Sequence, residues 1–249
     1  PATGANALAV AEYVVGTAMV LLRGVYQSSA AVASGKWPRA ALSSGRETAG
    51  RTLGLVGFGS IGQLTARLAR ALGMDVIAYD AMLGAGDRAY AATGVRAAGL
   101  DEVVRAADVV SLHVPLVAST RGLFSAARIA SMKRGAVLVN TARGGIVDEV
   151  ALARALKDGH LGGAAIDVFG AEPLPASSHF EGCPNLILTP HVAPDRAAGP
   201  GRAWAPPRRP VRAASSHRPR GRTRRSRGRA PQGRGDRRRR GERPRVPGL

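Results

Sequence analysis

The feature that most constrains this 249-residue chain is a regular alternation of short apolar runs with helical patterns from residue 52 onward. Apolar runs without polar alternation are typical of strands that are buried on both faces of a parallel sheet. The helical segments between them supply the crossovers that parallel pairing requires. The sequence therefore predicts an α/β fold with a doubly wound parallel sheet.

The predicted strands are rich in Val, Leu, Ile and Ala, and they cover residues 52–56, 75–79, 108–113, 136–140, 164–168 and 186–188. The predicted helices between them repeat apolar residues every three or four positions, and they cover residues 61–72, 100–106, 125–132 and 149–156. No internal repeat of 20 to 50 residues is visible, which argues against a solenoid or a propeller.

A glycine-rich turn directly follows the first predicted strand. Gly57, Gly59 and Gly62 form the pattern Gly-x-Gly-x-x-Gly at the start of a predicted helix. The first glycine permits a tight turn, the second lets the backbone approach a pyrophosphate, and the third lets the helix pack on the strand. We expect the backbone amides of Ser60 and Ile61 to face the phosphates, because a helix N-terminus carries unpaired N–H donors and positive potential.

An acidic residue, Asp80, ends the next predicted strand, 18 residues beyond Gly62. A carboxylate at this position accepts hydrogen bonds from the adenosine ribose hydroxyls, and its charge repels a 2′-phosphate. The sequence therefore predicts NAD rather than NADP as the cofactor. The alternative is a glycine-rich turn that binds no ligand.

Three later segments each place functional side chains next to the end of a predicted strand: VNTARGGIVDE with Arg143, AIDVFGAEP with Asp167 and Glu172, and NLILTPHVA with His191. Open α/β sheets bind their ligands at this edge. With these motifs and the glycine loop, residues 5–193 closely resemble the D-isomer-specific 2-hydroxyacid dehydrogenases, the family of phosphoglycerate dehydrogenase and hydroxypyruvate reductase. The resemblance extends to the AEY, GKW and LHVPL segments nearer the N-terminus.

The resemblance implies three catalytic residues. Arg143 matches the arginine that binds the substrate carboxylate and polarises the keto oxygen. His191 matches the acid–base histidine, which gives or takes a proton as hydride passes between substrate and nicotinamide. Glu172 matches its carboxylate partner, which orients the ring and favours the imidazolium. Each residue type also has ordinary structural uses, so the argument depends on their joint order and spacing.

The resemblance implies further cofactor contacts. Asp167 matches the residue that holds the nicotinamide carboxamide, and the backbone of Thr141 and Ala142 matches positions that line the nicotinamide ribose. Arg143 and His191 border the cofactor as well. The pattern around one more histidine, His113, is weaker, and a structural role is favoured for it over a cofactor contact.

Composition restricts the class of protein. Cys183 is the single cysteine, which excludes a disulfide framework and a cysteine-based zinc cluster and fits a reducing, cytoplasmic environment. No metal site is expected. Residues 5–22 are apolar apart from Glu12, but 18 residues barely reach bilayer length and an acid in mid-span is costly there. We expect a buried or interface helix and no membrane association.

The formal net charge of +19 is concentrated in residues 194–249, which hold nineteen arginines and three acidic residues. This Arg/Pro/Gly-rich tail lacks the apolar residues that a core needs, so disorder is predicted. Its abrupt change of composition is what out-of-frame translation of a GC-rich gene produces. The alternative is a basic tail that binds nucleic acid, which is disfavoured because Trp204 is its only aromatic residue.

Three segments are expected: 1–49 as a linker helix and dimerisation arm, 50–193 as a Rossmann-type NAD-binding domain, and 194–249 as the tail. The resemblance implies a second, substrate-binding domain that is mostly missing here, with an upstream portion absent, and a homodimer formed through the AEY helix and the arm around Trp37.

The expected function is hydride transfer between NAD(H) and C2 of a D-2-hydroxy acid or 2-keto acid, in a fragment whose activity we expect to be impaired. The alternative is an NAD-binding sensor or corepressor without turnover. Phosphoglycerate, glycerate or hydroxypyruvate, and sulfolactate-like acids all stay open as substrates.

Overall fold

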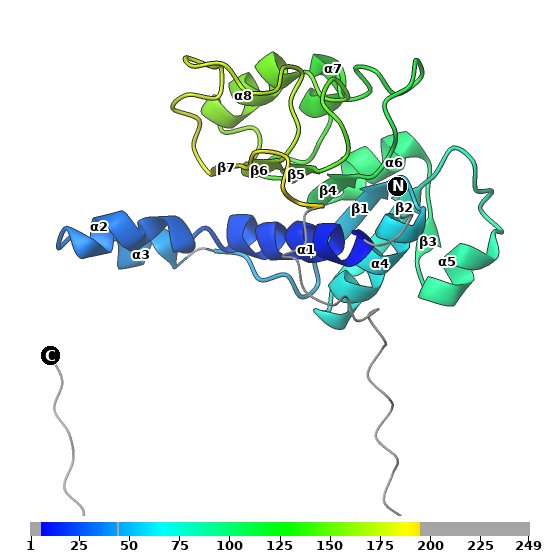
Figure 1. Ribbon diagram of the computed structural model, residues 1–249. Coiled ribbons are helices and arrows are strands. Elements are labelled where there is room, and N and C mark those ends of the chain that lie inside the picture. Colours follow the sequence, from blue (N-terminus) through cyan, green and yellow to red (C-terminus); the bar gives the residue numbers. More distant parts are fainter. Residues whose placement is uncertain (1–5, 44, 195–249) are drawn as a thin grey trace, which may run out of the picture. The chain divides into compact units, whose positions relative to one another are not determined.

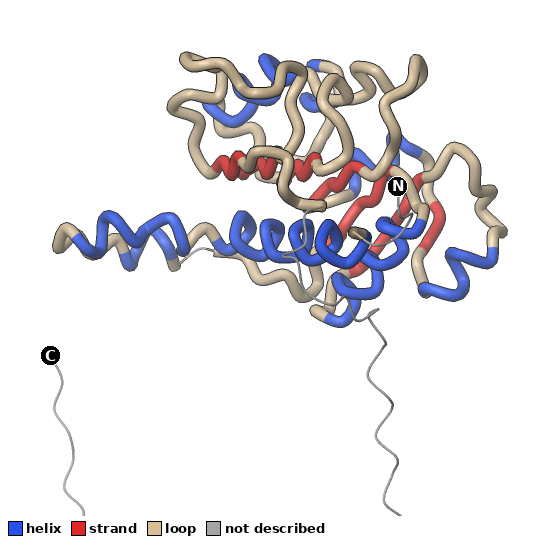
Figure 2. Tube along the Cα trace, viewed as in Figure 1, coloured by secondary structure: helices blue, strands red, loops and turns tan. Residues whose placement is uncertain are grey.

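The computed structural model describes residues 6–43 and 45–194, and these contain a seven-stranded parallel sheet (Figures 1 and 2). The strands in chain order are β1 Thr52–Val56, β2 Asp75–Tyr79, β3 Arg96–Ala97, β4 Val109–Leu112, β5 Val137–Asn140, β6 Gly163–Ile166 and β7 Leu186–Leu188. All neighbouring strands pair in parallel, in the order β3-β2-β1-β4-β5-β6-β7. The predicted doubly wound α/β fold is confirmed.

The strand order reverses between β1 and β4, which are neighbours in the sheet although two strands separate them in the chain. The chain first winds outward from β1 to β3 and then outward in the other direction from β4 to β7. In an open α/β sheet, ligands bind at the carboxyl ends of the strands beside such a switch point. The fold therefore places the loops after β1, β4 and β5 around one crevice.

Helices cover both faces of the sheet (Figure 1). The helices that pack on it are α1 Ala7–Arg23 and α4 Ser60–Ala71 on one face, and α6 Leu100–Ala106, α7 Ala126–Ala130 and α8 Glu149–Lys157 on the other. Each face has its own apolar cluster of buried residues, because strands buried on both sides present apolar side chains in both directions. The helix α5 Arg88–Thr93 precedes the edge strand β3.

The packing explains why these segments form these elements. In α1, Val10, Val14, Ala18 and Leu21 recur at helical spacing and are buried against α4 and the sheet. In β1, a Cβ on Gly54 would lie 2.8 Å from both the Ala107 and the Val103 side chains, so only glycine allows α6 to pack this closely. The expectation of a buried helix near the N-terminus is thus confirmed.

Residues 24–43 lead away from the sheet as an arm (Figure 1). The arm contains a 3₁₀ turn at Tyr26–Ser28, α2 Ser29–Ala33 and α3 Arg39–Leu42. Among the described residues, no single helix has the length and hydropathy to cross a bilayer. Only the pair Ala7–Arg23 and Tyr26–Ala33, which is bent by 68°, reaches that length and hydropathy when its two helices are counted together.

The sequence pattern did not predict α5 and β3. β3 is only two residues long, and α5 is a single short helix with two buried side chains, so neither has enough apolar periodicity to be recognised. The predicted three-segment division stays a prediction, and the predicted disordered tail lies outside the described residues.

Candidate active site

The glycine loop connects β1 to α4 at the carboxyl edge of the sheet. Gly57 has a φ of 99°, and a Cβ there would lie 2.6 Å from the carbonyl oxygen of His113. A Cβ on Gly62 would overlap the carbonyl oxygen of Gly57. These two glycines are therefore required by the packing of the protein itself.

Gly59 differs from its two neighbours in the motif. Its φ of −71° and ψ of −160° suit any residue, and a Cβ would meet nothing within 4 Å. No side chain caps α4, so the first backbone N–H groups, those of Ser60 and Ile61, are left for a ligand. A space that a Cβ would fill, next to unpaired helix donors, fits the pyrophosphate of a dinucleotide.

Asp80 follows β2 and holds the glycine loop. One carboxylate oxygen accepts a hydrogen bond from the Phe58 amide at 2.7 Å, and the other accepts one from the Met82 amide at 2.8 Å. Each oxygen keeps a second lone pair, so the carboxylate can still accept from ribose hydroxyls. Beside it lies a pocket of about 350 Å³, which Tyr90 also lines. The predicted ribose acceptor thus borders an open space, which residues 97–99 and Glu102 line as well.

His191 and Glu172 form a hydrogen-bonded pair. Nδ1 of His191 lies 2.9 Å from Oε2 of Glu172, and the Phe169 amide donates to Oε1 of Glu172 at 2.9 Å. The hydrogen bond from His191 is the main cause that lowers the pKa of Glu172, followed by the Phe169 amide and, more weakly, the positive charge of Arg143. The carboxylate therefore stays ionised and orients the ring so that Nε2 points away from it.

Asp167, at the end of β6, is fully buried and anchors the His191 loop. It accepts hydrogen bonds from the Thr189 hydroxyl at 2.5 Å and from the amides of Val192 and Ala193 at 3.0 and 2.9 Å. His191 has a φ of 57°, a conformation that a residue with a Cβ keeps only when its surroundings impose it.

The three hydrogen bonds to Asp167 impose that conformation from both sides of the histidine. They show Asp167 as an anchor, and its predicted contact with the nicotinamide carboxamide stays a prediction. A further hydrogen bond connects this loop to α1, because the Tyr13 hydroxyl lies 2.7 Å from the Thr189 hydroxyl.

Arg143 lies in the turn after β5. The Asn140 side chain accepts from the Ala142 amide at 3.1 Å and donates to the Arg143 carbonyl at 3.1 Å, which fixes the turn. The Arg143 guanidinium donates to the Ala142 carbonyl at 2.6 Å and has no carboxylate partner among residues 6–43 and 45–194. The buried Thr141 hydroxyl also lacks a partner within this part of the chain, which leaves a polar atom for a ligand here.

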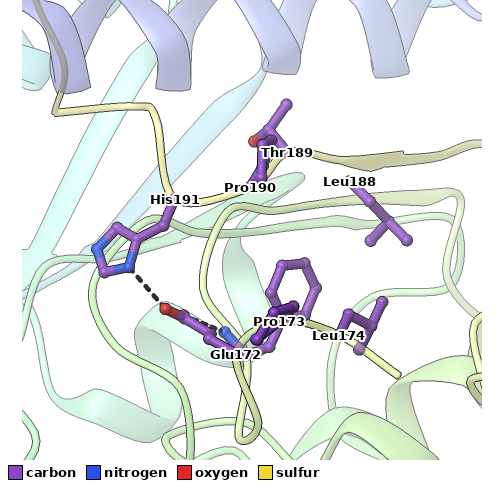
Figure 3. Close-up of a pocket in the computed structure, with 8 residues that line it drawn as sticks. Glu172, Pro173, Leu174, Leu188, Thr189, Pro190 and His191 are labelled. Carbon is purple, nitrogen blue, oxygen red and sulfur yellow. Dashed lines mark hydrogen bonds and ion pairs between the residues drawn. The ribbon is translucent and has the colours of Figure 1, made fainter. Parts of the chain in front are cut away.

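Two pockets meet at the His191–Glu172 pair. One, of about 440 Å³, is apolar apart from the pair (Figure 3) and is lined by Phe169, Pro173, Leu174, Leu188, Thr189 and Pro190 as well. The other, of about 430 Å³, includes two arginines and several glycines. Besides the pair, its lining residues are Leu116, Arg121, Arg143, Gly144, Gly145, Phe169 and Gly170. The second pocket brings the three predicted catalytic residues together, and the charged chemistry of an acid substrate belongs there.

Glu149, the first residue of α8, supports the same loops. Its Oε1 accepts from the Gly170 amide at 2.7 Å, and its Oε2 lies 3.3 Å from Nε2 of His179. A Cβ on Gly144 would overlap the Phe169 carbonyl, so the Arg143 turn packs directly on the backbone that carries Glu172. Glu149 was not predictable as a site residue, because a glutamate at a helix start also occurs simply to complement the helix dipole.

His113 follows β4 and takes no part in the pocket around Arg143. Desolvation by burial lowers its pKa from 6.5 to about 4, and its Nε2 lies 3.0 Å from the Ser111 hydroxyl. A neutral, hydrogen-bonded ring in this place supports the favoured structural role. Within the part of the chain that the structure describes, no group of three or more His, Cys, Asp or Glu could hold a metal ion.

Comparison with known proteins identifies the family. Residues 15–193 match the model of the D-isomer specific 2-hydroxyacid dehydrogenase, NAD binding domain. The chain belongs to this family. The match covers more than half of the chain and includes the loops after β1, β2, β5, β6 and β7 that form the candidate site. NAD is therefore the cofactor of this chain, as predicted.

Individual relatives agree. The chain is 53% identical over 193 residues to the (S)-sulfolactate dehydrogenase of Chromohalobacter salexigens, and the aligned region covers 78% of this chain and 62% of that protein. It is 44% identical over 191 residues to the D-3-phosphoglycerate dehydrogenase of Haemophilus influenzae, and the aligned region covers 75% of this chain and 45% of that relative.

Among solved structures, the NAD-dependent formate dehydrogenase of Staphylococcus aureus in complex with NAD superposes with a TM-score of 0.70 at 32% identity, covering 76% of this chain and 56% of that one. The chain therefore spans less than two thirds of the length of these relatives.

Proposed function

We propose that this chain carries the NAD-binding and catalytic half of an enzyme that transfers hydride between NAD(H) and C2 of a D-2-hydroxy acid or 2-keto acid. One observation carries the proposal: the hydrogen-bonded pair of His191 and Glu172 lines the same pocket as the unpaired guanidinium of Arg143. An acid–base group and a carboxylate-binding cation are the two functions that 2-keto acid reduction needs from the protein.

Each residue has a defined part. NAD supplies the hydride acceptor or donor when it is bound. Arg143 binds the substrate carboxylate and polarises the C2 oxygen, where negative charge develops during reduction. His191 protonates that oxygen through Nε2, and Glu172 stabilises the protonated ring through Nδ1. In the oxidation of a hydroxy acid, Nε2 takes the proton back.

The alternative of an NAD sensor without turnover is less well supported. A sensor needs the glycine loop and Asp80, whereas NAD binding alone does not require a Glu172–His191 pair in the same pocket as Arg143. We also propose, in line with the impaired activity expected from the sequence, that turnover by this chain is slow.

Binding of a substrate analogue separates the two proposals without requiring turnover. Oxamate resembles a 2-keto acid but accepts no hydride, so it can be titrated into the chain in the presence of NADH and followed by calorimetry. We expect oxamate to bind to the wild type and to lose most of its affinity in Arg143→Gln, with NADH binding retained. NADH binding without any oxamate binding would favour the sensor.

We also propose a homodimer, a small-molecule partner rather than nucleic acid, and a cytoplasmic location. The arm exposes Trp37 at 77% and Tyr26 at 60%, and such apolar side chains favour a protein partner. The free thiol of Cys183 fits a reducing compartment. Light scattering of the wild type and of Trp37→Ser tests the dimer, which the substitution should weaken.

A further inference from the structure

We propose that the catalytic pocket contains a second anion-binding subsite, formed by Arg121, and that the substrate carries a second anionic group besides its carboxylate. This inference rests on the proposed function, in which Arg143 binds the carboxylate. The class of substrate is a 2-hydroxy or 2-keto acid whose carbon chain also bears a sulfonate, phosphate ester or second carboxylate.

Arg121 is presented by a tightly folded loop. The Thr120 hydroxyl donates to the Pro115 carbonyl at 2.5 Å and accepts from the Val117 amide at 2.8 Å. The Arg121 amide donates to the Val117 carbonyl at 3.0 Å. These bonds tie both ends of residues 115–121 together, so the position of the Arg121 backbone is set by the fold.

The loop is also paired with the turn that follows Arg143. The Gly122 amide donates to the Gly145 carbonyl at 2.9 Å, and the Phe124 amide donates to the Ile146 carbonyl at 3.0 Å. The Arg121 guanidinium lies against this turn, since its Nη1 would be 3.6 Å from a Cβ on Gly145. Two segments far apart in sequence thus hold Arg121 and Arg143 on the same pocket.

The charges in this pocket are unbalanced. Among the described residues, the Arg121 guanidinium has no hydrogen bond or ion pair, and the Arg143 guanidinium donates only to a backbone carbonyl. The one carboxylate that lines the pocket, Glu172, is engaged by His191. Other exposed arginines, such as Arg67 and Arg154, also lack an ion pair among the described residues, so Arg121 is distinguished by lining the same pocket as Arg143.

Two guanidinium forks without a protein partner can bind two anionic groups, because each fork matches the oxygens of a carboxylate, sulfonate or phosphate. A substrate with one carboxylate would leave Arg121 unused. The geometry therefore favours a dianionic acid over one that ends in an uncharged group.

The test compares two unreactive probes of similar length in the presence of NADH. Butanoate carries one carboxylate, and 3-sulfopropanoate carries a carboxylate and a sulfonate; neither has an oxygen at C2. We expect calorimetry on the wild type to show about tenfold tighter binding of 3-sulfopropanoate, the effect of one charge-assisted contact. Arg121→Gln should remove that preference, whereas the control Arg105→Gln, which also deletes one exposed positive charge, should keep it.

Equal affinity of the wild type for both probes, or no binding of 3-sulfopropanoate, would overturn the proposal. So would an equal loss in Arg121→Gln and Arg105→Gln, because net charge alone would then explain it. Arg143→Gln separates this inference from the proposed function. If that variant binds butanoate as well as the wild type does, the assignment of the carboxylate to Arg143 is wrong, whatever Arg121 does.

Discussion

Nδ1 of His191 lies 2.9 Å from Oε2 of Glu172, although the two residues are 19 positions apart in the chain. The pKa of Glu172 is lowered from 4.5, chiefly by this hydrogen bond. The ionised carboxylate therefore stabilises the folded protein above pH 4.5, and this contribution to folding stability is lost as the pH falls through the lowered pKa. Near neutral pH the carboxylate is ionised and His191 has a fixed partner.

Glu149 should position this pair through the Gly170 amide. In Glu149→Ala that amide loses its acceptor, which we expect to lower the free energy of unfolding by about 1–2 kcal/mol and to loosen the loop that carries Glu172. Nitrogen NMR of the imidazole should then show His191 shifting away from the tautomer protonated at Nδ1. Glu149→Gln keeps an acceptor for Gly170 and should retain that tautomer. An unchanged tautomer in a folded Glu149→Ala would show that Glu149 does not position the pair.

Gly59→Ala should weaken cofactor binding strongly without harming the fold. The added methyl group meets no protein atom within 4 Å, so the free energy of unfolding should change by less than about 0.5 kcal/mol. It would occupy the space expected for the pyrophosphate, and we expect NADH affinity to fall by roughly 100-fold, or about 2.7 kcal/mol. Fluorescence titration and urea denaturation measure the two quantities.

Gly62→Ala is the contrasting variant. Its methyl group would overlap the Gly57 carbonyl, which should cost about 1–3 kcal/mol of folding stability. If Gly59→Ala destabilises the protein as much as Gly62→Ala does, the assignment of the open space to a ligand is incorrect.

Asp80→Asn should shift the preference between cofactors. The amide keeps an oxygen to accept from Phe58 but removes the negative charge that would repel a 2′-phosphate, so the ratio of NADPH to NADH affinity should rise by about tenfold or more. Titrations with both cofactors measure the ratio. Asp75, at the other end of β2, serves as a control in Asp75→Asn. A ratio that stays constant in Asp80→Asn would refute the ribose assignment.

His113 should make folding sensitive to mild acid. Its pKa is about 4 in the folded protein and 6.5 ordinarily, so between these values the unfolded chain takes up a proton that the folded protein does not. Stability should therefore fall as the pH drops from about 6.5 to about 4, by at most about 3 kcal/mol. In His113→Gln this pH-dependent loss of folding stability should vanish. Urea denaturation at several pH values tests it, and parallel curves for both proteins would contradict the prediction.

Much of the fold was predictable from local pattern. The strands from Thr52–Val56 to Leu186–Leu188 are continuous apolar runs, and such runs separated by helices have few solutions other than a buried parallel sheet. The glycine loop and Asp80 were recognisable because dinucleotide binding needs those residue types at fixed spacing. Arg143, Glu172 and His191 were recognisable only jointly, as motifs after successive strands, and their assigned roles await experiment.

Other features were decided by the tertiary structure. The buried Asp167 holds His191 in a left-handed conformation through amides of the following residues, and nothing in the local sequence marks that conformation. The pairing of the loop that presents Arg121 with the turn after Arg143, and the contact of Glu149 with Gly170, join segments more than 20 residues apart. Periodicity along the chain determines which strands and helices form, because burial of an apolar face is a local property. The partners of a polar side chain depend on which loops the sheet brings to one edge, and only the folded chain determines that.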